Sequence, residues 1–187
     1  MARKLAEREG ARATIRVRGR PIAATRGFEA RMFRVDVETL EAYFAFDPKR
    51  EADLRRFDRL ICIAAPTLKR YFHQGAPAGQ PGMRFRMIGY ARSSYRATSG
   101  EKVEWPVVGV ALQKNYISVY FAVTKGGAPV TDPYAGRLGE RRMGHNNFSF
   151  ERFDDLDVAA AAALLSVAAQ IFALDPENVP RTMRASA

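Results

Sequence analysis

Two phenol rings and one hydroxyl group alternate along a short stretch of the sequence, at Tyr116, Ser118 and Tyr120. Successive side chains of a β-strand point to opposite faces of its sheet, so these three should share one face. The intervening aliphatic side chains, such as Ile117 and Val119, should then lie on the other face, against helices. A sheet face with aromatic rings and hydroxyl groups can stack on a planar ligand and form hydrogen bonds with it.

Nearby basic and aromatic side chains extend this candidate ligand-binding set. They are Lys114, in the turn before the strand, and Arg84, Arg86 and Tyr90, from a stretch upstream. Arginine beside aromatic rings suits an anionic or aromatic small ligand, stacked single-stranded bases, or a partner in a homodimer. The alternative is a half-exposed sheet face without a ligand, because tyrosine is common in β-strands. A pocket next to Tyr116, Tyr120 and Lys114 would favour ligand binding.

The sequence contains no established catalytic motif. Its two histidines, His73 and His145, have no second metal ligand at a recognised spacing, and structural or solvated histidine is the simpler interpretation. The segment Gly136-Arg-Leu-Gly139, followed by Arg141 and Arg142, could hold an anion, and a plain surface loop is the alternative. The sequence therefore favours a non-enzymatic protein, although a catalytic triad is spatial and need not show in the order of residues.

Most of the positive charge lies at the start of the chain. Residues 1–34 hold ten Lys or Arg against three Glu, which accounts for +7 of the formal net charge of +10. This segment has little apolar periodicity, so we expect a disordered extension. Four of its arginines, Arg12, Arg16, Arg18 and Arg20, are candidates for contacts with nucleic-acid phosphates. The alternatives are a transit peptide, or an extension that begins upstream of the natural start, because Met32 precedes the domain.

The composition is that of a globular protein in a reducing compartment. Hydrophobic residues make up 47% of the chain and charged residues 27%. Cys62 is the only cysteine, so an intrachain disulfide is excluded, and we expect it to be a small core residue. The longest apolar run, within residues 158–169, is too short and too rich in alanine to span a membrane. We expect a cytoplasmic protein with no membrane partner.

Hydrophobic periodicity predicts the elements that would position the candidate face. We expect helices from Asp36, as a cap, to Pro48, at about residues 49–72 with Pro66 as a kink or break, and at about residues 156–172. Strands are expected at residues 83–88, in a hairpin within residues 105–123, and at residues 147–150. A long loop would occupy residues 124–145.

This order predicts a two-layer α+β fold. An antiparallel sheet of about four strands would carry an N-terminal helix pair and a C-terminal helix, packed on one of its faces. The domain would span residues 35–175, with a frayed C-terminal tail at residues 176–187.

The same order of elements, with its particular residues, resembles the bacterial YdhG-like family. The matching segments are Asp36-Val-Glu-Thr-Leu-Glu-Ala-Tyr43, residues 60–65 with the following proline, Ile88-Gly-Tyr-Ala-Arg-Ser-Ser-Tyr95, residues 108–120, Leu138-Gly139, and residues 148–150 leading into 154–157. The resemblance covers about residues 35–173, and residues 114–120 are its most specific part. Two positions depart from the family pattern: a proline expected after the first strand and a cysteine expected before the last strand are both missing.

The resemblance implies a domain of unknown function that is related to a frataxin-like iron chaperone. Iron is therefore the cofactor that it implies, and hard cations bind clustered carboxylates. The tight acidic cluster of this chain is Asp154, Asp155 and Asp157. Helix capping explains the same three residues without a metal.

Three functional hypotheses follow from these observations. The first is a non-enzymatic YdhG-like module without a cofactor, which binds a small ligand or a protein partner through the open sheet face. The second is association with nucleic acid through the arginine-rich extension. The third is an iron-binding protein of the frataxin-like kind.

Overall fold

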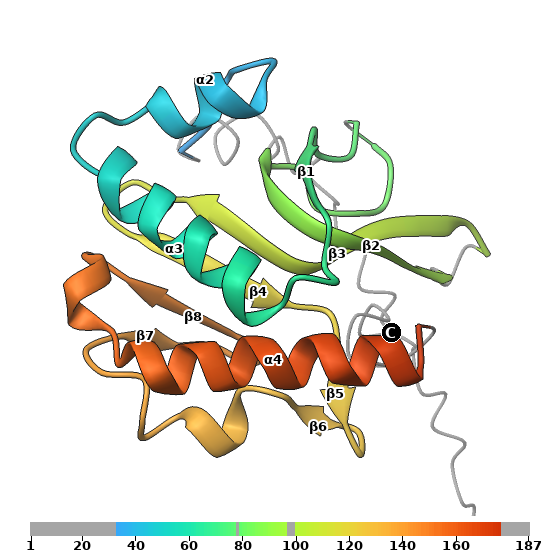
Figure 1. The fold of residues 1–187 in the computed structure, drawn as a ribbon. Coiled ribbons are helices and arrows are strands. Elements are labelled where there is room, and N and C mark those ends of the chain that lie inside the picture. Colours follow the sequence, from blue (N-terminus) through green and yellow to red (C-terminus); the bar gives the residue numbers. More distant parts are fainter. Residues whose placement is uncertain (1–32, 78, 97–99, 177–187) are drawn as a thin grey trace, which may run out of the picture. The chain divides into compact units, whose positions relative to one another are not determined.

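The computed structural model describes residues 33–77, 79–96 and 100–176 (Figure 1). The chain divides into two units, residues 1–32 and 33–187, and every described residue belongs to the second unit. The nucleic-acid candidates Arg12, Arg16, Arg18 and Arg20 lie outside the described residues.

A six-stranded antiparallel sheet forms one layer of the domain, in the order β1-β2-β3-β4-β8-β7. Its strands are β1 (Arg70–His73), β2 (Met87–Arg96), β3 (Lys102–Leu112), β4 (Ile117–Phe121), β7 (Arg142–Met143) and β8 (Asn147–Phe150). A separate two-stranded sheet pairs β5 (Thr124–Lys125) with β6 (Ala128–Pro129).

Helices form the second layer. They are α2 (Leu40–Ala45), α3 (Glu51–Ala64) and α4 (Val158–Leu174), with short 3-10 turns η1 (Asp132–Tyr134) and η2 (Phe153–Asp155). Figure 1 shows α3 and α4 on the same face of the sheet. The predicted α+β fold is therefore confirmed. The sheet has two more strands than the four we expected, because the edge strands β1 and β7 are too short to give a periodic signal.

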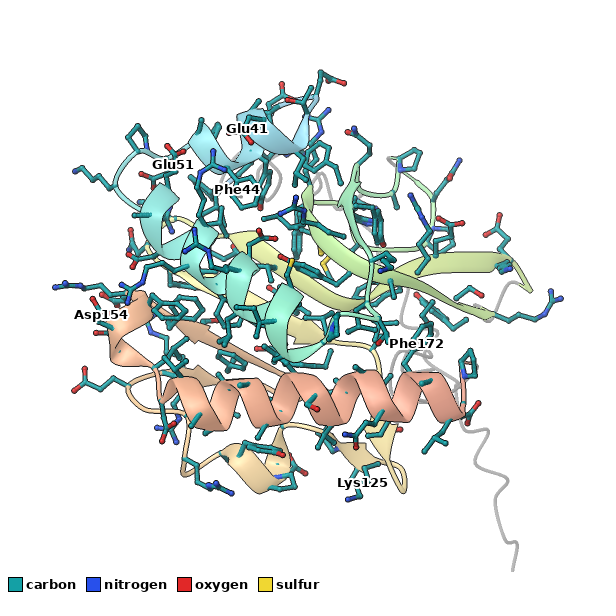
Figure 2. All side chains as sticks on the ribbon, viewed as in Figure 1. Glu41, Phe44, Glu51, Lys125, Asp154 and Phe172 are labelled. Carbon is teal, nitrogen blue, oxygen red and sulfur yellow. The ribbon has the colours of Figure 1, made fainter. Side chains whose placement is uncertain are left out.

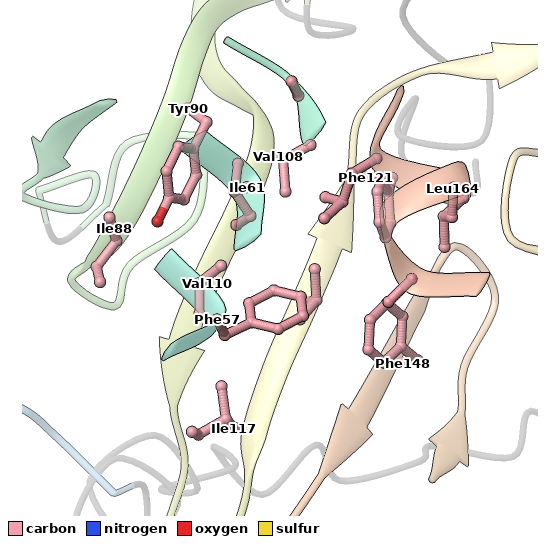
Figure 3. Packing of buried hydrophobic residues seen from close by; sticks show 14 of the residues in the cluster. Phe57, Ile61, Ile88, Tyr90, Val108, Val110, Ile117, Phe121, Phe148 and Leu164 are labelled. Carbon is pink, nitrogen blue, oxygen red and sulfur yellow. The ribbon is translucent and has the colours of Figure 1, made fainter. Parts of the chain in front are cut away.

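The hairpin predicted within residues 105–123 is confirmed by the register of β3 and β4. Val110 pairs with Val119, and Leu112 pairs with Ile117. These side chains face the helices, where Phe57 of α3 contacts the ring of Phe150 at a centroid distance of 5.1 Å. Figure 3 shows the resulting core between the central strands, α3 and α4. Because its aliphatic side is buried there, β4 must present Ser118 and Tyr120 on the opposite face of the sheet.

Several predicted boundaries were wrong. Helix α3 ends at Ala64, well before Phe72, because Pro66 has no N–H to continue the helix, and the chain then enters β1. Thr39, not Asp36, caps α2, where its hydroxyl accepts a hydrogen bond from the amide of Ala42. The strand predicted at residues 83–88 begins only at Met87.

Cys62 is also misplaced by the sequence analysis. It lies on the solvent side of α3 and is exposed, not part of the core. Partial desolvation of the thiol, and next the negative charge of the Asp58 carboxylate, raise the pKa of Cys62. A raised thiol pKa leaves little thiolate at neutral pH, so Cys62 has the character of an unreactive surface thiol.

None of the helices within the described part of the chain is long and apolar enough to cross a membrane.

Candidate functional site

The sheet face away from the helices carries the predicted tyrosine set, but most of that face is covered. Ser118 is only 2% exposed, and its hydroxyl hydrogen-bonds to that of Ser149 at 2.8 Å. Tyr120 packs against Phe85 at a ring-centroid distance of 5.8 Å, and burial raises the pKa of its phenol. The expectation of an open face is therefore wrong for Ser118 and Tyr120, although both lie on the predicted side of β4.

A short segment before β2 provides this cover. Met83 and Phe85 pack on Met87, Ala111 and Tyr120 in a small hydrophobic cluster that is separate from the main core. Sequence patterning did place Met83, Phe85 and Met87 on a common side. It could not indicate that this side lies on the tyrosine face.

Tyr90 does not belong to the tyrosine face. It pairs with Val108, whose side chain faces the helices, and it is 0% exposed (Figure 3). Its hydroxyl donates a hydrogen bond to Asp58 Oδ1 at 2.7 Å. Tyr90 is thus a core residue with a satisfied hydroxyl, and its place in the ligand-binding set is corrected.

The predicted basic residues do not line the cavity that Tyr116 lines. Arg86 forms ion pairs with Asp36 and with Glu38, the latter at 3.2 Å. It therefore connects the residue before β2 to the segment before α2. Arg84 and Lys114 are exposed, the latter in the β3–β4 turn. None of the three lines the cavity beside Tyr116 that is described next.

One end of the tyrosine face opens into a cavity of about 280 Å³, which we call the Tyr116 cavity. The β3–β4 turn contributes Tyr116 to its wall, β8 contributes Ser149, and the loop before β7 contributes Arg141. The other charged side chains that line it are Glu140, Arg142, Glu151 and Asp155. Sequence patterning identified Arg141 and Arg142 as a weak anion-binding signal and Asp155 only as part of the acidic cluster, and it missed Glu140 and Glu151.

Tyr116 is held from both sides. On the helix side, buried Arg50 donates hydrogen bonds to the carbonyl oxygens of Gln113 and Tyr116, at 2.5 and 2.8 Å. On the cavity side, the guanidinium of Arg142 lies 5.2 Å from the centre of the Tyr116 ring, within range of a cation–π contact. Arg142 is itself exposed, and its contact with Glu151 is long, at 3.4 Å. The backbone at Tyr116 is therefore held in place, while the arginine beside its ring can be displaced at low cost.

The loop wall of the Tyr116 cavity is fixed by backbone contacts. Gly139 forms a bridge with Leu156, and the amide of Glu140 donates to the carbonyl of Asp155 at 2.8 Å. Arg141 donates to the carbonyl oxygens of Gly139, at 3.1 Å, and of Ala135. These contacts join the loop to the segment before α4, far apart in the sequence, so no local pattern could have predicted the cavity.

A second cavity, of about 370 Å³, lies between the start of the connector after β1 and the first residues of β3. His73, Arg92 and Glu104 are among its lining residues, and Arg92 pairs with Glu104 at 3.0 Å. The Nε2 atom of His73 is buried and has no hydrogen-bond partner among the described residues. Burial lowers the pKa of His73, an effect that a hydrogen bond to the backbone of Met83 partly offsets.

The lowered pKa of His73 predicts a pH-dependent stability. The unfolded chain, with a histidine pKa of about 6.5, takes up a proton more readily than the folded domain. The free energy of unfolding should therefore decrease as the pH falls below about 6.5, until the folded domain is also protonated. We expect His73→Gln to remove this decrease between pH 7 and pH 5 in urea titrations. The matched variant His145→Gln, at an exposed position, should retain it; equal behaviour of the two variants would contradict the prediction.

The acidic cluster is engaged in local contacts. Asp154 pairs with Arg56 at 2.7 Å, which lowers the pKa of the Asp154 carboxyl group, and Figure 2 shows Asp154 at the edge of the domain. Asp155 accepts a hydrogen bond from the amide of Arg152 at 2.8 Å. Asp157 caps α4 through the amide of Ala160, at 2.9 Å. In the ranges that the structure describes, no group of three or more His, Cys, Asp or Glu side chains is placed to hold a metal ion.

Comparisons with protein-family models, with curated proteins and with solved structures found no match. The resemblance to the YdhG-like family therefore stays a hypothesis.

Proposed function

We propose that this chain is a cytosolic, non-enzymatic binding module of the YdhG-like type, and that it binds a small molecule in the Tyr116 cavity. The observation that carries the proposal is the cavity itself, at the uncovered end of the predicted tyrosine face. Its volume of about 280 Å³ is at the lower limit for small-molecule sites, so the ligand should be about the size of a single ring with its substituents.

Rigidity of the aromatic wall supports the same proposal. A ring that is already held in place loses little conformational entropy when a ligand stacks on it. Tyr116 meets part of this condition, because Arg50 holds its backbone from the helix side and Arg142 lies against its ring. Arg142 currently lies against the same ring, so a planar ligand would replace that contact with its own.

Binding should depend on the ring of Tyr116. We expect a one-ring aromatic probe such as benzoate to shift the backbone amide signals of residues 140–142 and 149–151 in ¹H–¹⁵N spectra of the full chain. Tyr116→Leu should weaken binding by about tenfold, since base-like stacking on an aromatic side chain contributes about 1–3 kcal/mol. Tyr95→Leu is the matched control, because that half-buried tyrosine lies outside the cavity lining and should leave the affinity unchanged. Equal affinities of the two variants would sink the proposal.

A further inference from the structure

Among the residues that the structure describes, no direct ion pair balances the charge of Arg141. Its two hydrogen-bond partners within the described residues are carbonyl oxygens, those of Gly139 and Ala135. Carbonyl oxygens satisfy donors but carry no net charge, so the guanidinium keeps its positive charge in the cavity wall. The other arginine of the cavity, Arg142, differs in this respect because it has a carboxylate neighbour in Glu151.

Arg141 also has hydrogen-bond donors to spare. A guanidinium has five N–H donors in a planar fork. One donor on each terminal nitrogen is used by a carbonyl oxygen, and the buried Nε has no partner in the described ranges of the chain. The remaining donors are on the two terminal nitrogens, and paired donors of this kind suit a planar anionic group such as a carboxylate.

The carboxylates of the cavity limit the charge of the ligand. Glu140, Glu151 and Asp155 line the same space as Arg141 and Arg142. A dianion such as a phosphate monoester would double both its attraction to the two arginines and its repulsion from the three carboxylates, and the carboxylates outnumber the arginines. One negative charge on the ligand can be balanced by Arg141, whereas a second would face acidic neighbours.

From these contacts we propose that the ligand is a small planar monocarboxylate, whose carboxylate pairs with Arg141 while its ring lies along Tyr116. This inference rests on the proposed function, since it names the class of ligand for the same cavity. It assigns two separate roles: Tyr116 supplies affinity for the ring, and Arg141 supplies selectivity for the charge.

The test compares three one-ring probes on the full chain by calorimetry and ¹H–¹⁵N spectra: benzoate, the isosteric neutral benzamide, and the dianionic phenyl phosphate. We expect benzoate to bind at least about tenfold more tightly than either of the others, as a charge-assisted hydrogen bond would require. Arg141→Gln should remove the preference for benzoate over benzamide. Arg137→Gln, at an exposed arginine of the same loop that lies outside the cavity lining, should keep it.

The outcomes separate this inference from the function on which it rests. If benzoate and benzamide bind equally, and both depend on Tyr116, the binding module stands and the carboxylate assignment is overturned. If phenyl phosphate binds best, the charge argument is overturned as well. If no probe shifts the amides of the cavity, both proposals fail. Should Arg141→Gln not fold, the preference of the unmodified chain for benzoate, and its decrease as salt is raised from 0.05 to 0.5 M, decide the question.

Discussion

Asp58→Ala is expected to lower the free energy of unfolding by about 2–3 kcal/mol, because it leaves a buried hydroxyl donor unpaired and also removes the partly exposed ion pair with Arg70. Asp58 is 9% exposed on the inner side of α3. It accepts hydrogen bonds from the Tyr90 hydroxyl, at 2.7 Å, and from Arg70 Nη1, at 2.5 Å. Alanine would leave the fully buried hydroxyl of Tyr90 without an acceptor. An unpaired buried donor destabilises the folded state by its whole desolvation free energy.

Two comparisons isolate this effect in chemical denaturation. Tyr90→Phe removes the stranded donor, so the double variant Asp58→Ala/Tyr90→Phe should be less destabilised than the sum of the single variants. Asp154→Ala is the matched control, because Asp154 also pairs with an arginine, Arg56, but both partners are exposed. Exposed pairs contribute about 1 kcal/mol or less. A loss for Asp58→Ala no larger than that for Asp154→Ala would contradict the prediction.

The sequence was a good guide where the signal was local. Alternation along residues 116–123 correctly placed Ile117, Val119 and Phe121 against the helices. Of the three aspartates that helix capping was expected to explain, Asp157 does cap α4 through the amide of Ala160, while Asp154 pairs with Arg56. Both signals arise within a few residues, where backbone geometry alone fixes which way a side chain points.

The register between neighbouring strands could not be predicted from the sequence. We expected three residues on the tyrosine face because they are separated by even numbers of positions, as side chains on one face of a strand are: Arg84, Arg86 and Tyr90. The pairing of Tyr90 with Val108 places Tyr90 on the helix face instead. Even spacing within a strand shows which residues share a face. Only the pairing with neighbouring strands shows whether that face is toward the helices or away from them.

The burial of Tyr120 and the formation of the Tyr116 cavity both depend on contacts between segments that are distant in the sequence. The segment that hides Tyr120 comes from before β2, as the contact of Tyr120 with Phe85 shows. The Tyr116 cavity exists because the loop near Gly139 lies against residues 155–157. No periodicity reports such contacts, so the sequence could identify Tyr116 as a candidate without identifying its site.

Gly139→Ala should be the most damaging change in the loop beside the Tyr116 cavity, with an expected loss of about 3 kcal/mol or more in the free energy of unfolding. Gly139 has a φ of +81°, a conformation that costs an L-residue about 1–2 kcal/mol. A Cβ at this position would lie 2.2 Å from the carbonyl oxygen of Asp155 and 2.8 Å from the amide nitrogen of Asp157. Both obstacles are backbone atoms, so the loop must move away from the segment before α4.

Gly127→Ala separates backbone strain from this contact. Gly127 has nearly the same φ, +84°, but a Cβ there would meet nothing within 4 Å. It should therefore show only the cost of the left-handed conformation, and the excess loss for Gly139→Ala measures the displacement of the loop. Because Arg141 is two residues from Gly139, the same displacement should abolish the preference for benzoate over benzamide, while Gly127→Ala retains it. Equal losses of stability in the two variants would show that the loop is not held against residues 155–157 as the structure describes.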